Sequence, residues 1–170
     1  MSDVHAQVRQ YTKMLKNLDG QLSKAADAAT AKKYDVAVLL QSRLAPDMFP
    51  LIRQIQSACD GAKFFAARTS GREAPKHPDT EQTLDEIRAR IQTGVDYLDS
   101  FGPAAFDGWE SRIVPLGFMP GKGVAAPDWI REFSLPNTYF HFAMAYAILR
   151  HNGIDLSKTD FIGSMNIKDL

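Results

Sequence analysis

Apolar residues in the first part of the chain recur every three or four positions, the spacing that places side chains on one face of a helix. The residues that share this face are Val4, Val8, Tyr11, Leu15, Leu18 and Leu22. Asp3 can cap the start of such a helix, and the pattern fades in the alanine-rich run before Lys32. We therefore predict a long first helix, followed by a short helical segment over residues 36–41.

Two prolines, Pro46 and Pro50, precede the second long helical pattern. Proline has no backbone donor, so it fits the first turn of a helix better than the interior. From Leu51 the apolar residues continue at helical spacing as far as Gly71, and Asp47 is placed to cap the helix. The sequence thus predicts a second long helix that begins near the prolines and ends at Gly71.

A third helical pattern follows a polar loop over residues 72–79. Asp79 or Thr80 can cap its start, with Gln82 three residues after the aspartate, and it ends near Gly102. Its apolar face runs through Leu84, Ile87, Ile91, Val95 and Leu98. Its charged residues are predicted to form a solvated face: Asp85, Glu86, Arg88 and Arg90.

Glycines and prolines are dense over residues 106–127, where the helical pattern stops. Residues 112–116 could form a short extended segment, with a small hairpin through residues 120–123. We predict a small irregular or hairpin insertion here, followed by a helical turn capped by Asp128 and a kink or restart at Pro136.

The fourth long helix is predicted over residues 137–151, ending at Asn152–Gly153. It is apolar on nearly all sides, and such a helix must be covered on nearly all sides. It is therefore either the central helix of the fold or part of a subunit interface. The four long segments predict an all-α fold.

A length of 170 residues, 45% of them hydrophobic, fits one globular domain over residues 1–170. The 20 basic and 20 acidic residues balance, so the chain lacks the excess positive charge of proteins that bind nucleic acid or anionic lipid. The sequence shows no signal-peptide core or membrane-spanning run, which makes the cytoplasm the expected location. Cys59, the single cysteine, is predicted to be a buried thiol.

His141, one of four histidines, is the best candidate for a functional site. It lies in mid-helix among aromatic residues, where an imidazole needs a hydrogen-bond partner, and Asn137 lies one turn earlier on the same face. The pair could be structural, satisfied by Asp47 or Gln54 of the second helix. It could instead mark a polar pocket between two helices, where bundles commonly hold ligands. An Asp47–His141 couple would also make the imidazole a candidate general base.

Three segments resemble a known family: residues 43–51 (RLAPDMFPL), 135–141 (LPNTYFH) and 145–153 (AYAILRHNG). They are similar to a bacterial family of unknown function in the DinB/YfiT-like metalloenzyme superfamily, and the likeness covers nearly the whole chain. The resemblance implies an up-down-down-up four-helix bundle that is often a homodimer.

The resemblance also implies a position for a divalent metal. In the superfamily, one histidine of the second helix and an H-x-x-x-H pair of the last long helix hold the metal, and some relatives are thiol transferases or isomerases. Matching the helix end at Leu149–Arg150 places these ligands on Gln54, Asn137 and His141. Two of the three positions thus carry amides, which are weak neutral ligands, so the resemblance does not carry a metal such as Zn or Ni over to this chain.

Three functions fit the sequence. The first is a metal-free, dimeric, ligand-binding bundle whose pocket is lined by Asp47, Gln54, Asn137, Tyr139 and His141. The second is a metal- or histidine-dependent transferase or hydrolase acting on a small molecule, with or without a thiol, although the sequence identifies no nucleophile or oxyanion donor. The third is a structural dimerisation module in which the Asn–His pair is a core hydrogen bond. Fold alone does not decide among them, because bundles host unrelated functions.

Overall fold

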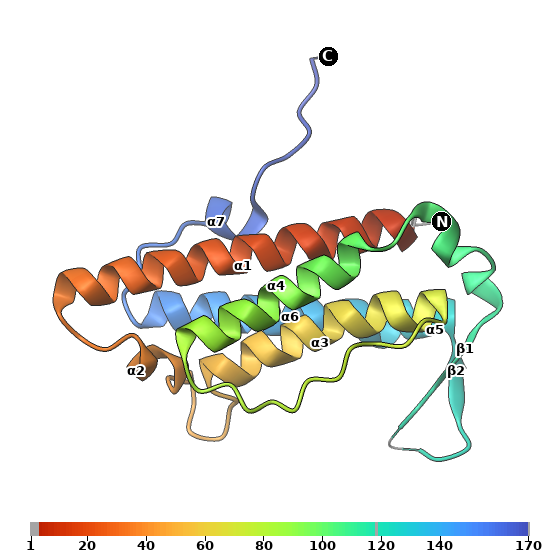
Figure 1. The fold of residues 1–170 in the computed structure, drawn as a ribbon, viewed down its shortest axis with the longest axis horizontal. Coiled ribbons are helices and arrows are strands. Elements are labelled where there is room, and N and C mark those ends of the chain that lie inside the picture. Colours follow the sequence, from red (N-terminus) through yellow and green to blue (C-terminus); the bar gives the residue numbers. More distant parts are fainter. Residues whose placement is uncertain (1–3, 118, 170) are drawn as a thin grey trace.

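The computed structural model describes residues 4–117 and 119–169. It is mostly helical, as predicted, with four long helices: α1 (Val4–Lys32), α3 (Leu51–Ser70), α4 (Leu84–Asp99) and α6 (Leu135–His151). Figure 1 shows these helices side by side, with α3 and α4 running opposite to α1 and α6. None of the helices in the described ranges combines the length and apolar character needed to cross a bilayer.

Shorter elements connect the long helices. The helix α2 (Ala37–Leu40) follows α1, and α7 (Lys158–Ile162) lies against α1 near the end of the chain. Strands β1 (Ile113–Pro115) and β2 (Gly123–Ala125) pair antiparallel, with Val114 opposite Val124. The predicted hairpin before the last long helix is therefore confirmed.

Two helix starts differ from the prediction. Pro50 is the residue that caps α3, and Asp47 lies exposed in the turn before it without a capping hydrogen bond. The residue that caps α4 is Thr83, and neither Asp79 nor Thr80 caps this helix. Thr83 accepts from the amide of Glu86, whose carboxylate accepts in return from the amide of Thr83, so this reciprocal pair fixes the start. The predicted cap at Asp3 lies outside the described residues.

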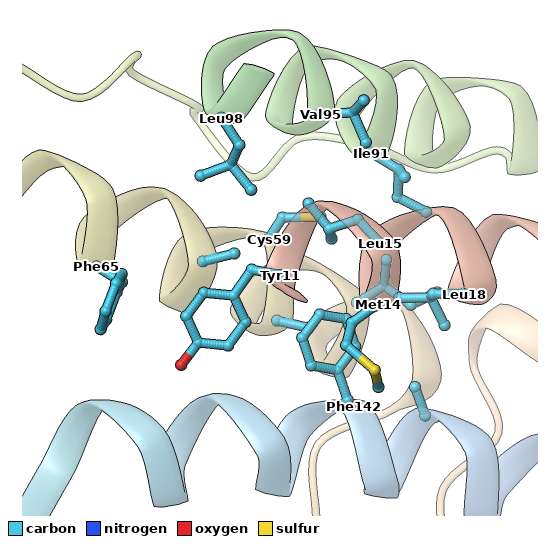
Figure 2. Packing of buried hydrophobic residues seen from close by; sticks show 14 of the residues in the cluster. Tyr11, Met14, Leu15, Leu18, Cys59, Phe65, Ile91, Val95, Leu98 and Phe142 are labelled. Atoms are coloured by element: carbon cyan, nitrogen blue, oxygen red, sulfur yellow. The ribbon is translucent and has the colours of Figure 1, made fainter. Parts of the chain in front are cut away.

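One hydrophobic cluster fills the space between the long helices, as Figure 2 shows. Each helix contributes fully buried side chains, among them Leu15 of α1, Phe65 of α3, Leu98 of α4 and Phe142 of α6. Cys59 belongs to this cluster, and its burial raises the pKa of the thiol to about 12. The prediction of a buried thiol is confirmed.

A helical run leads into α6 without a break. The short helix α5 (Ala126–Trp129) continues through a wide π-type turn over residues 130–134 into α6. The turn widens just before Pro136, where a backbone donor is missing, so the predicted kink takes the form of a π-turn. Single-turn π segments of this kind are frequent at functional sites.

The prediction that α6 is covered on all sides is not met within one chain. Its inner face packs against α3 and α1, but Phe140 of α6 and Phe133 of the π-turn are each about half exposed. The helix α6 is therefore not a central helix of this chain, and the alternative of a subunit interface stays a prediction.

Candidate functional site

A groove with a volume of 270 Å³ runs between α3 and α6, and we call it the α3/α6 groove. Its aromatic walls are Phe64 of α3, Trp129 of α5 and Phe133 of the π-turn. Its polar lining comprises Ser57, Asp60, Arg68, Ser134, Asn137 and His141. The groove thus combines flat apolar surfaces with hydrogen-bonding groups, the combination typical of small-molecule sites.

The two helices approach each other closely at the base of the groove. A Cβ atom on Gly61 would lie 2.4 Å from Oγ1 of Thr138, so only glycine fits at this position of α3. Thr138 is fully buried, and its hydroxyl donates to the carbonyl of Ser134 at 2.7 Å. This contact fixes the part of α6 that carries Asn137 and His141.

His141 is held by one amide from α3. Nδ1 of His141 lies 2.7 Å from Oε1 of Gln54, while Nε2 of Gln54 donates to the carbonyl of Phe49 at 3.3 Å. Because that carbonyl needs a donor, the amide nitrogen faces Phe49 and the oxygen faces His141. Nδ1 therefore carries the imidazole proton, and Nε2 keeps its lone pair.

The imidazole of His141 is neutral at pH 7. Burial disfavours the charged form and lowers the pKa of His141 below its usual value. Within the described ranges, Nε2 of His141 and the side chain of Asn137 make no hydrogen bond. The groove thus holds one imidazole acceptor and one free amide, a turn apart on the same helix.

The structure brings together three of the five predicted pocket residues: Gln54, Asn137 and His141. Tyr139 lies two positions from each of the last two, so it points to another side of α6, where its hydroxyl accepts from Gln7 at 3.3 Å. Asp47 is exposed and does not line the groove. Of the two hydrogen-bond partners that the sequence offered for His141, Asp47 and Gln54, the structure has Gln54.

A buried cation that was not predicted from the sequence lies beside the groove. The side chain of Arg90 is only 1% exposed and binds three carboxylates, those of Asp60, Asp79 and Glu81. The prediction that Arg90 lies on a solvated face is therefore wrong. Arg90 lies three positions after Ile87 and one before Ile91, both in the apolar stripe of the helix, and this spacing was the available signal.

Asp60 links this cation to the groove. Its Oδ1 accepts from Arg90 at 2.8 Å and from Lys63, a buried lysine, at 2.7 Å. Lys63 also donates to Nδ1 of His77 at 2.9 Å, and burial together with Lys63 and Arg90 lowers the pKa of His77. Asp60 thus joins two buried cations to the wall of the groove.

The residues present do not fit the metal of the superfamily. No group of three or more His, Cys, Asp or Glu side chains that could hold a metal occurs among the residues that the structure describes. Of the two amides at the expected ligand positions, the oxygen of Gln54 already accepts the proton of His141 Nδ1. A structural or catalytic zinc takes at least three imidazole, thiolate or carboxylate ligands, and His141 is the only such group at these three positions.

The chain is similar to a known protein family and to a solved structure. The model of a family described as a domain of unknown function (DUF1993) matches residues 4–162. The chain belongs to this family. A crystal structure of a DinB family member protein from Shewanella denitrificans, at 1.83 Å resolution, has 45% sequence identity, and the match covers 96% of this chain and 93% of that one with a TM-score of 0.92.

The resemblance to a family of unknown function within the DinB-like superfamily is thus confirmed. None of the curated proteins matches the chain. The DUF1993 description states no activity.

Proposed function

We propose that this DUF1993 protein binds a small molecule in the α3/α6 groove without a metal. The proposal rests on the imidazole of His141, of which only one nitrogen has a partner. Its Nδ1 is hydrogen-bonded to Gln54, and its Nε2 has no protein partner in the described ranges. Nε2 is not a buried atom, so it is accessible from the groove, where a ligand donor could take the place of water.

The lining of the groove defines the class of ligand. His141 Nε2, the amide oxygen of Asn137 and the carboxylate of Asp60 all accept hydrogen bonds, so the ligand should carry N–H or O–H donors. Phe64 and Phe133, which are both partly exposed at the groove wall, offer aromatic surface for a planar group. The volume of 270 Å³ lies just below the range of about 300–1,000 Å³ for drug-sized pockets, which indicates a ligand the size of a single ring system.

We also propose that the site belongs to a single domain with an up-down-down-up four-helix order. The opposed directions of the helix pairs in Figure 1 support the order, and the continuity of the hydrophobic cluster supports a single domain. In such a bundle a ligand site between facing helices is a common arrangement.

Fluorescence of Trp129 can test the binding proposal, because Trp129 lines the groove and the only other tryptophan is Trp109. In a Trp109→Phe variant, we expect benzamide and 2-aminopyridine, both planar with N–H donors, to change the emission saturably in the presence of EDTA. Toluene, which has no donor, is the control. A further His141→Phe substitution, which keeps a ring but removes the acceptor, should abolish the effect. The proposal fails if no probe gives a saturable change.

A second candidate is an enzyme that uses His141 as a general base. The favouring observation is the neutral imidazole with its Nδ1 proton held by Gln54, the arrangement that a histidine base requires. Metal analysis of protein purified without chelator separates this candidate from a metal-dependent one. Stoichiometric zinc or nickel that is lost in His141→Ala would contradict the metal-free proposal and support a metalloenzyme.

A further inference from the structure

A second groove lies between the last turn of α3 and the β-hairpin, with a volume of 460 Å³. Three of its lining side chains are arginines: Arg68 of α3, Arg72 just after α3, and Arg112 just before β1. Ala67, Gly71 and residues 113–115 complete the lining, and we call this site the arginine groove. The chain is neutral overall, so three arginines in one groove are a local concentration of positive charge.

The three arginines lack the acidic partners that most of the other arginines have. Among the described residues, none of them forms an ion pair, and the side chains of Arg68 and Arg112 form no hydrogen bond at all. Arg72 donates only to the carbonyl of Ser100, at 3.4 Å. Burial without a counterion also lowers the pKa of Arg68. Arg90 differs, since it binds three carboxylates.

Aromatic rings hold two of the guanidinium groups in place. Cζ of Arg68 lies 5.1 Å from the ring centre of Trp129, and Cζ of Arg72 lies 4.2 Å from that of Phe101. Such cation–π contacts use the face of the guanidinium and leave the N–H groups at its edge available. The rings thus orient the two groups without consuming their donors.

Arg112 is positioned by a glycine. Gly71 has a left-handed φ of +78°, and a Cβ atom there would lie 2.5 Å from Nη1 of Arg112. Nε of Arg112 is buried and has no acceptor among the described residues. The guanidinium end of Arg112 therefore lies against the turn that follows α3, at the edge of the arginine groove.

We propose that the arginine groove binds a compact oxyanion, the phosphate or carboxylate group of a small molecule. The edge of a guanidinium offers two parallel N–H groups that match two oxygens of such an anion. Arg112 lines one side of the groove, and the half-buried Arg68 and the exposed Arg72 line it from the end of α3. This proposal does not rest on ligand binding in the α3/α6 groove: the two grooves share Arg68, but only the arginine groove is lined by Arg72 and Arg112.

NMR signals of the arginine Nε–H groups can test the proposal at constant ionic strength. We expect inorganic phosphate or malonate to shift the signals of Arg68, Arg72 and Arg112 saturably, relative to chloride. Saturation by phosphate alone identifies a phosphate site, and saturation by malonate alone identifies a carboxylate site. If neither anion gives saturable shifts, the proposal is wrong.

Variants separate a built site from general charge attraction. Arg112→Gln should weaken anion binding about tenfold, since charge-assisted hydrogen bonds are lost. Arg72→Gln, at an exposed position, should also weaken it and guards against misfolding of the first variant. Arg9→Gln removes the same charge from a surface ion pair with Asp99 and should leave binding unchanged. His141→Phe should leave it unchanged too, so the two proposed sites fail independently. Equal weakening by Arg9→Gln and Arg112→Gln would overturn the proposal.

Discussion

Gly61 is the residue on which the spacing of α3 and α6 depends. A Cβ atom at Gly61 would clash with Thr138, which is fully buried and cannot turn aside because it is β-branched. We expect Gly61→Ala to lower the free energy of unfolding by about 1–3 kcal/mol, measured by urea denaturation.

Gly20 provides the matched control for this substitution. It lies inside α1, and a Cβ atom there would meet nothing within 4 Å. Because alanine suits a helix interior better than glycine, Gly20→Ala should raise stability by about 0.5–1 kcal/mol. Equal effects of the two substitutions would show that α3 and α6 do not approach closely at Gly61.

The lowered pKa values of His141 and His77 determine a pH dependence. In the folded chain the pKa of each imidazole is lower than its value of about 6.5 in the unfolded chain. The unfolded chain therefore takes up protons first as the pH falls. We expect the free energy of unfolding to decrease as the pH falls below about 6.5, as measured by denaturation at a series of pH values.

Gln54→Glu should reverse the effect that protonation of His141 has on the free energy of unfolding. A carboxylate beside Nδ1 favours the imidazolium, so we expect NMR titration to show the pKa of His141 higher by about 1–3 pH units. The folded chain would then bind the proton first, and His141 would add stability below its new pKa and lose it as the pH rises through that value. An unchanged pKa would show that Gln54 and His141 are not in contact.

The residues of the candidate site were only partly predictable. Asn137 and His141 share a helix face by their spacing, which the sequence shows directly. The same rule excludes Tyr139 from that face. The choice of Gln54 over Asp47 required the actual start of α3 at Pro50, because one turn of helix decides which of them reaches His141.

At the scale of elements, the loop over residues 72–83 is attached to the helices through Arg90. Asp79 and Glu81 of this loop, with Asp60 of α3, share the guanidinium of Arg90 on α4. We expect Arg90→Met to lower the free energy of unfolding by about 3 kcal/mol. This is the low end for a broken buried ion pair, because the loop carboxylates can turn to water. Hydrogen exchange over residues 72–83 should become faster.

Arg88→Met is the control on the same helix. Arg88 pairs with Asp19 at the surface, with both side chains more than one third exposed, so its loss should cost less than about 1 kcal/mol. Similar costs for the two substitutions, with unchanged exchange in the loop, would mean that Arg90 does not anchor this segment.

The elements themselves were largely predictable, and the polar contacts between them were not. Apolar spacing defines α1 and α3, and the density of glycine and proline indicates the hairpin. The start of α4 was placed too early because Asp79 resembles a cap, whereas its carboxylate binds Arg90. Sequence periodicity reports which face is buried, but it does not report an acidic loop folded over a buried arginine.

For the whole molecule, the predicted homodimer remains to be measured. The exposed aromatic side chains Phe133 and Phe140 at α6 are the surface that a second copy would cover. We expect light scattering with size-exclusion chromatography to show a dimer, and Phe140→Asp to convert it to a monomer, because a charge in an apolar interface is costly. Val38→Asp, at a more exposed apolar residue of α2, should leave the dimer intact. A monomeric wild-type protein would contradict the prediction.

The central claim is that the α3/α6 groove offers His141 Nε2 to a ligand without a metal. Long-range proton–nitrogen NMR of His141 in the presence of EDTA tests it most directly. We expect Nδ1 to be protonated and Nε2 to be unprotonated, with only the Nε2 signal moving markedly as benzamide is added. A proton on Nε2, or an Nε2 signal that does not respond to any planar N–H donor, would contradict the claim.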